Sequence, residues 1–178
     1  MNNERMDELI IRRITTADAS LFWRLVDRER ARIARYFPIT TGRCVDERAC
    51  AAYVQDLVAQ ANQGQAYTHL VFTASSAEPV GMVMLKSFDA LVGKCEVAYF
   101  VAAGHERKGI ATGALAWAVD ESFRRFNLQK VFLRVDPDNV ASIRVAEKNG
   151  FAREGLLRSD FRTSDGRLLD VIHFGKLR

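Results

Sequence analysis

The sequence lacks the features that would place a protein in a membrane, in the secretory pathway or around a metal ion. No run in its 178 residues approaches the roughly 20 apolar residues of a membrane span, and Met1–Arg5 carries no apolar signal-peptide core. Cysteine and histidine occur only three times each, without disulfide or metal-ligand spacing. We therefore expect a reduced, cytoplasmic protein with no membrane segment and no metal site.

What is present is typical of a globular chain. Apolar residues make up 48% and charged residues 27%, which suits a single domain spanning residues 1–178 with a buried core. The net charge of +4 is compatible with a polyanionic ligand. Nucleic acid is not an expected partner, because the basic run Arg24–Arg35 is interrupted by Asp27 and Glu29 and reads as a solvated helix face.

One stretch, Gly104–Thr112, organises the rest of the chain. It joins a strand-like run to a long helical pattern that begins near Gly109. Backbone N–H groups at a helix start are unpaired and face the positive end of the helix dipole, so the expected guest is phosphate. A Walker loop is excluded because Ile110 and Ala111 follow Gly109, and the glycine spacing does not fit a dinucleotide fingerprint.

Hydrophobic periodicity and turn residues predict an alternating α/β chain. Strand, helix and strand over residues 95–135 form a βαβ-like unit, with the loop at the carboxyl end of its first strand, where open α/β sheets place ligands. We expect strands at 9–14, 68–73, 80–86, 94–101, 130–135, 152–163 and 168–176, helices from about 16 to 36, 45 to 63, 109 onward and 140 to 149, and a loop at 37–42.

Two separated motifs resemble the GNAT acetyltransferase superfamily. The loop fits its (Gln/Arg)-x-x-Gly-x-(Gly/Ala) pattern at Gly109 and Ala111, but its first position is Glu106. Asn139-x-x-Ser142, followed by the Val-Ala-Glu-Lys-Asn-Gly-Phe run that ends at Phe151, resembles the second coenzyme A motif. Glu154-Gly155 and Asp170-Val171 resemble the branch that acetylates ribosomal-protein N-termini.

The resemblance implies a mixed, largely antiparallel sheet of about seven strands flanked by about four helices. The sheet would splay open between the strand of Glu96 and the strand of Val131. It also implies acetyl-CoA as cofactor, with the pantothenate arm along the backbone of Tyr99–Val101 and the diphosphate on the amides of Arg107–Thr112. The cofactor-binding residues it implies are Tyr99, Phe100, Val101, Arg107, Lys108, Gly109, Ile110, Ala111, Thr112, Asn139, Ser142 and Lys148.

Acetyl transfer to an amine needs a neutral amine, an oxyanion donor and a proton for the departing thiolate. An N-terminal α-amine has a reference pKa of about 7.7–8.0, so its demand for a base is light, whereas lysine, at about 10.4, needs more help. For the base, Glu96 and Asp160 both remain open. Ser142 matches the serine that relatives place beside the sulfur, and Tyr99 is the reserve proton donor.

The acceptor is the least determined part. By analogy, Phe37, Pro38 and the loop to Gly42 wall its site. The first hypothesis is an acetyltransferase for a protein N-terminal α-amine of ribosomal-protein type. The second replaces the acceptor with a small amine, polyamine, amino acid or antibiotic. The third is a non-catalytic acyl-CoA-binding module, which Glu106 at the first loop position favours. The branch resemblance also makes a homodimer plausible.

Overall fold

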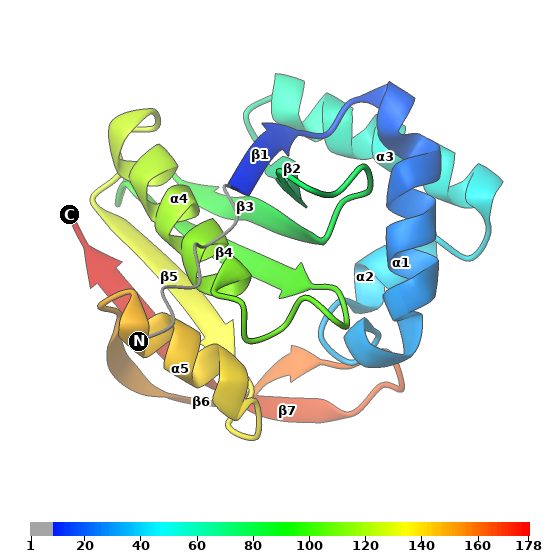
Figure 1. Ribbon diagram of the computed structural model, residues 1–178. Coiled ribbons are helices and arrows are strands. Elements are labelled where there is room, and N and C mark those ends of the chain that lie inside the picture. The colour runs from blue at the N-terminus through cyan, green and yellow to red at the C-terminus, as the bar shows by residue number, and fades with distance from the viewer. Residues whose placement is uncertain (1–8) are drawn as a thin grey trace, which may run out of the picture.

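The computed structural model describes residues 9–178 and arranges them around one seven-stranded sheet (Figure 1). The strand order is β1-β2-β3-β4-β5-β7-β6, and only the β4–β5 pair is parallel. No helix in this part of the chain is long and apolar enough to cross a membrane. The elements are β1 (Leu9–Arg13), a 3₁₀ helix (Thr16–Asp18), α1 (Ala19–Ile33), α2 (Pro38–Arg43), α3 (Glu47–Asn62), β2 (Tyr67–Thr73), β3 (Gly81–Asp89), β4 (Lys94–Val101), α4 (Ile110–Arg124), β5 (Lys130–Val135), α5 (Val140–Lys148), β6 (Ala152–Arg162) and β7 (Leu168–Leu177).

Two apolar cores lie on opposite faces of the sheet. Helices α4 and α5 cover one face, and α1, α2 and α3 cover the other (Figure 1). Alternate strand residues point to opposite faces. Along β4, Val97 therefore packs into the core beneath α4, whereas Phe100 packs into the core beneath α1 and α3. The central strand β4 is thus in contact with both helical layers.

The sheet opens between β4 and β5. These strands pair over only three positions, from Lys94 opposite Lys130 to Glu96 opposite Phe132. Beyond Glu96, β4 stays paired with β3 and β5 with β7, but β4 and β5 no longer pair with each other. The facing edges therefore carry backbone N–H and C=O groups without a strand partner. The predicted mixed, splayed sheet is confirmed, with five α-helices rather than about four.

The segment after α1 differs from the sequence prediction. Residues 37–42 were expected to form a loop, but Pro38–Arg43 is helix α2. Proline is tolerated in a first helical turn, where its missing N–H would have no partner, so Pro38 marks a helix start as well as the end of the preceding helix.

The turn after α2 also brings the sulfur atoms of Cys44 and Cys50 to within 2.6 Å of each other, a contact that the spacing of these residues did not predict. Both are buried free thiols.

A buried histidine between β2 and α4 gives the fold a pH dependence. His69 packs edge-on against Trp117, with ring centroids 4.7 Å apart. Burial lowers the pKa of His69 from 6.5 to about 4, and Arg13 and Arg125 act in the same direction. As pH falls below 6.5, the unfolded chain binds a proton that the folded chain does not bind until about pH 4.

We therefore expect the free energy of unfolding to drop by about 2–3 kcal/mol between pH 6.5 and pH 4 because of this group. Urea titrations at several pH values would measure the drop. In His69→Phe, which keeps an aromatic ring against Trp117, that part of the pH dependence should be absent. An identical pH profile for the two proteins would contradict the prediction.

Candidate active site

The loop between β4 and α4 presents a concave row of backbone N–H groups. Gly104, Arg107 and Gly109 all have left-handed backbones, with φ of 79°, 59° and 78°. Such reversals turn successive amides to one side and create a nest for an anion. For Arg107 this backbone costs of order 1–3 kcal/mol, a cost commonly found at ligand-binding loops. The strained backbone of the loop is therefore better explained by ligand binding than by a contribution to the stability of the fold.

The start of α4 is uncapped. Gly109 occupies the N-cap position, and no side chain accepts a hydrogen bond from the first turn. Among residues 9–178, the N–H groups of residues 109–112 have no hydrogen-bond partner. Free amides and the positive end of a 15-residue helix together favour an anionic group such as a diphosphate. The uncapped helix start is as the sequence predicted, and the binding of a diphosphate there stays a prediction.

A cleft of about 920 Å³ begins at this loop and runs into the gap between β4 and β5. Strand β4 contributes residues 96–101 to its wall, and β5 contributes Leu133, Arg134 and Val135. The start of α5, the last turn of α1, Lys86 of β3 and Phe161 of β6 also line it. The cleft thus joins the anion cradle to the unpaired strand edges, an arrangement that suits an elongated ligand with an anionic end.

Ser142 and Tyr99 both line this cleft and are neighbours in it. Asn139 caps α5 by accepting a hydrogen bond from the Ser142 N–H at 3.1 Å, which fixes the first turn of the helix and hence the serine. Burial raises the pKa of Tyr99 to about 12, and the neighbouring Ser142 side chain acts in the opposite direction. The Tyr99 hydroxyl has no hydrogen-bond partner among the described residues. The Tyr99 hydroxyl therefore keeps its proton at neutral pH.

Glu96 and Asp160 are linked by one arginine. The guanidinium of Arg134 donates to both oxygens of Glu96, each at 3.1 Å, and to Asp160 Oδ2 at 3.2 Å. Glu96 is only 5% exposed, and Lys86 lies 3.5 Å from it. Asp160 is exposed and sits in a bulge of β6 at which Ser159 has a positive φ of 52°. A β-bulge changes the direction of the side chains around it, which explains how Asp160, on the edge strand β6, contacts Arg134.

The end of α1 and the residues that follow it line another part of the cleft. Phe37 lines it and packs edge-on against Phe100, with ring centroids 5.2 Å apart. Tyr36 lines it too, and burial together with the Asp136 carboxylate raises the pKa of Tyr36. Pro38 and Gly42 do not line the cleft, so of the predicted acceptor wall only Phe37 takes part.

Residues 8–152 match the family described as the acetyltransferase (GNAT) domain. The chain belongs to the GNAT acetyltransferase family. Among curated relatives, the "Uncharacterized N-acetyltransferase p20" of Bacillus licheniformis is 32% identical over 116 residues, which are 65% of this chain and 65% of the relative. For the first three curated relatives, the matched part spans between 45% and 65% of the relative's length.

Solved GNAT structures share the whole fold. Ribosomal-protein-S5-alanine acetyltransferase from Vibrio fischeri superposes with a TM-score of 0.86 at 21% identity, covering 95% of this chain and 92% of that one. Spermidine N-acetyltransferase from Vibrio cholerae, solved with CoA and spermine, superposes with a TM-score of 0.77 at 24% identity, covering 95% of each. These likenesses establish the GNAT fold, and they include two different kinds of acceptor.

The GNAT cleft gathers most of the residues predicted from the motifs. Those that line it are Glu96, Tyr99, Phe100, Val101, Arg107, Gly109, Ile110, Ala111, Thr112, Asn139, Ser142 and Lys148. Lys108 and Asp160 do not line it, although Asp160 reaches it indirectly through Arg134. The roles of all these residues remain predictions.

Sequence reasoning missed four cationic residues of the GNAT cleft: Arg134, Lys86, Arg32 and Arg144. The sequence pattern could have indicated Arg134. Arg134 lies two residues from Phe132 on a strand whose other face is apolar, and Phe132 is the register partner of Glu96. A cation and a buried carboxylate on the same face of neighbouring strands are expected to pair. The contact of Arg32 depends on how α1 packs, and no local pattern indicates it.

Proposed function

We propose that this chain is an N-acetyltransferase that uses acetyl-CoA and acts on a protein N-terminal α-amine. The observation that carries the proposal is the uncapped start of α4 opening into the gap between β4 and β5. When bound, acetyl-CoA supplies an acetyl group activated as a thioester. In this proposal residues 1–178 act as one catalytic domain. The formation of a homodimer stays a prediction. The three free thiols agree with a cytoplasmic setting.

Each part of the cleft has a distinct task in this proposal. The amides of residues 107–112, with Lys148 nearby, hold the diphosphate. The unpaired edge of Tyr99–Val101 orients the arm and offers a backbone N–H to the carbonyl oxygen. Ser142 donates a proton to the sulfur as it leaves. Glu96 or Asp160, acting through a water molecule, accepts the proton that the amine loses.

The charges that line the cleft favour an α-amine over a polyamine. Three of the four carboxylates that line the cleft are paired with cations: Glu96 with Arg134 and Lys86, Glu106 with Arg32, and Asp136 with Arg35. A polycationic acceptor needs unpaired carboxylates. An α-amine with a pKa near 7.7–8.0 is partly neutral already, so it needs neither an acidic pocket nor a strong base.

The runner-up acceptor is a small amine or polyamine. It is supported by the structural likeness to spermidine N-acetyltransferase and by Asp138, a cleft carboxylate for which no ion pair is found among the described residues.

Thiol release from acetyl-CoA in the presence of matched acceptors tests the proposal. The panel is a lysine-free peptide beginning with Ala or Ser, the same peptide with its α-amine blocked, and spermidine. We expect turnover with the free peptide only, with mass spectrometry placing the acetyl group on the α-nitrogen. The rate should rise with pH through about 8, as the α-amine loses its proton.

Each other result assigns a different function. Turnover with spermidine alone supports the small-amine reading. Binding of acetyl-CoA without turnover on any acceptor supports the non-catalytic module. An absence of binding contradicts the proposal as a whole.

A further inference from the structure

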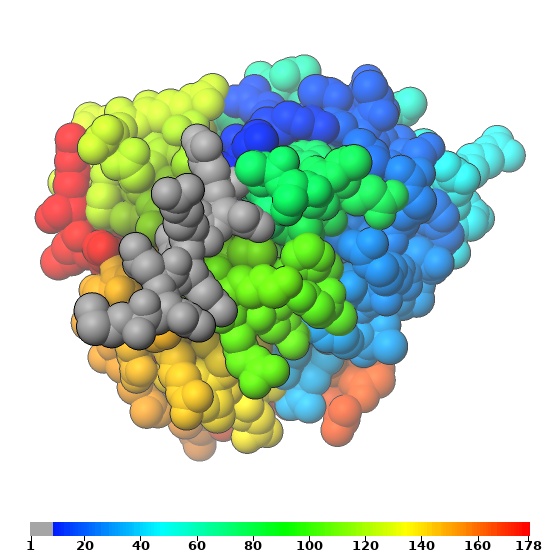
Figure 2. Space-filling model, in the orientation of Figure 1, coloured from blue at the N-terminus to red at the C-terminus, as the bar shows by residue number. Residues whose placement is uncertain are grey.

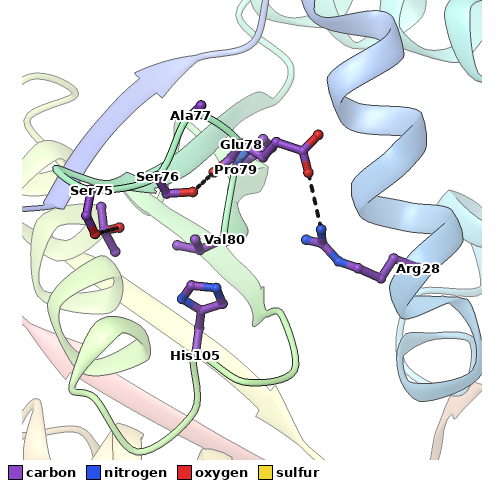
Figure 3. Close-up of a pocket in the computed structure, with 9 residues that line it drawn as sticks. Arg28, Ser75, Ser76, Ala77, Glu78, Pro79, Val80 and His105 are labelled. Atoms are coloured by element: carbon purple, nitrogen blue, oxygen red, sulfur yellow. Dashed lines mark hydrogen bonds and ion pairs between the residues drawn. The ribbon is translucent and has the colours of Figure 1, made fainter.

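Helix α1 carries a row of arginines that meets the loops of the other layer. Arg24, Arg28 and Arg32 are four residues apart and so lie on one face of the helix. Arg24 and Arg28 both pair with Glu78 in the loop between β2 and β3, and Figure 3 shows Arg28 reaching toward Glu78 above His105. The basic run that looked like a solvated helix face is therefore only half-exposed and is paired with loop carboxylates.

The third arginine of the row reaches the anion-binding loop. The guanidinium of Arg32 pairs with Glu106 and also donates to the Val101 carbonyl oxygen at 3.4 Å. Arg32 and Glu106 both line the cleft, with side chains 42% and 56% exposed. The loop after β4 lies directly against α1 at the surface (Figure 2). A cation from a helix about 75 positions earlier in the chain thus sits on the one loop position that departs from the family pattern.

A buried carboxylate holds this contact in place. Glu29, one turn before Arg32, is 1% exposed and pairs with Arg28 and Arg32. Its Oε2 also accepts a hydrogen bond from the N–H of Ala103 at 3.1 Å, two residues after the end of β4. A charge-assisted hydrogen bond from buried Glu29 fixes the loop against α1. The position of Arg32 relative to Glu106 is therefore set by the fold rather than by two mobile side chains.

We propose that Arg32 is a coenzyme A-binding residue of this chain, which supplies from α1 the positive charge that the loop's own first position lacks. This inference rests on the proposed placement of the diphosphate on residues 107–112. A bare carboxylate at Glu106 repels a diphosphate held by the neighbouring amides. Arg32 cancels that repulsion, and it also ties the helix that ends at the acceptor wall to the cofactor loop.

The charge account predicts an ordered set of affinities. Removing Arg32 leaves Glu106 uncompensated, so Arg32→Ala should weaken coenzyme A binding roughly five-fold, a size set by the partial exposure of both groups. Removing the carboxylate instead leaves the guanidinium free for the diphosphate, so Glu106→Gln should tighten binding by about the same factor. The double variant has no net change of charge and should return to within about two-fold of the wild type.

Calorimetric titration of coenzyme A into the four proteins measures these affinities without any catalytic step. Arg24→Ala is the matched control, because it removes a cation from the same face of α1 without touching the cleft, and its affinity should equal that of the wild type. Raising the salt to about 1 M shortens the screening length to about 3 Å, so the differences among the four proteins should shrink.

Two results would overturn the inference while leaving the proposed function intact. One is a wild type that binds coenzyme A while the double variant is as weak as Arg32→Ala, which would make Arg32 a tether and not a charge compensator. The other is unchanged affinity in Glu106→Gln, a variant that decides the matter even if Arg32→Ala unfolds. A wild type that does not bind coenzyme A overturns both proposals.

Discussion

Replacing Ser142 with alanine is expected to lower kcat by roughly 10²-fold, the lower end of what a positioned general acid contributes. The serine lies in the first turn of α5, in the cleft beside Tyr99. Alanine keeps the backbone N–H that donates to the Asn139 cap, so the helix start should be preserved. Steady-state kinetics with the peptide acceptor should show the fall in kcat with little change in the KM for acetyl-CoA.

Tyr99→Phe is the matched variant for this prediction. The phenol is buried, its pKa is raised to about 12, and its hydroxyl makes no hydrogen bond among the described residues. Removing that hydroxyl changes the surroundings of the neighbouring Ser142 side chain but breaks no hydrogen bond among the described residues, so we expect only a few-fold change in kcat. If Tyr99→Phe loses two orders of magnitude and Ser142→Ala loses little, the proton donor is the tyrosine.

Replacing Arg134 with glutamine is expected to lower the free energy of unfolding by about 3 kcal/mol. The reason is that Glu96, 5% exposed, then loses its two-pronged partner, and a buried charge left without its partner typically costs about 3–5 kcal/mol. Lys86, 3.5 Å from Glu96, stays in place, which holds the cost toward the low end of that range. Urea denaturation followed by circular dichroism measures the difference.

The same substitution at an exposed ion pair gives the control. Arg124 pairs with Asp120 on the outer face of α4, with side chains 81% and 55% exposed, so Arg124→Gln should cost less than about 1 kcal/mol. Adding Glu96→Gln to Arg134→Gln should recover most of the lost stability, because the buried charge is then gone, and Lys86 and Asp160, which also lose a partner, are partly exposed to solvent. Additive losses in that double variant would mean that Arg134 acts through packing alone.

Elements with a strong local pattern were predictable from the sequence. The bounds of β4 and β5 were predicted as observed, because their apolar and β-branched runs are buried whatever the rest of the chain does. The cradle at residues 104–112 was also predictable, since glycines and a helix start are local features. Helix α2 was not, because proline reads equally well as a helix end and as a first-turn residue.

The ion pairs of the cleft could not be predicted from the local sequence. Glu96 was singled out from the sequence as a buried carboxylate and a possible base, but its partners Arg134 and Lys86 lie on neighbouring strands. Likewise, from the sequence Glu106 was only a departure from the loop pattern of the family. In the structure α1 packs beside the loop, and Arg32 pairs with Glu106. The sequence by itself determined the order of the elements apart from α2, the glycine-rich start of α4 and the family. Only the tertiary structure decided which carboxylates stand free in the cleft, because ion pairs depend on distances between segments that are remote in the chain.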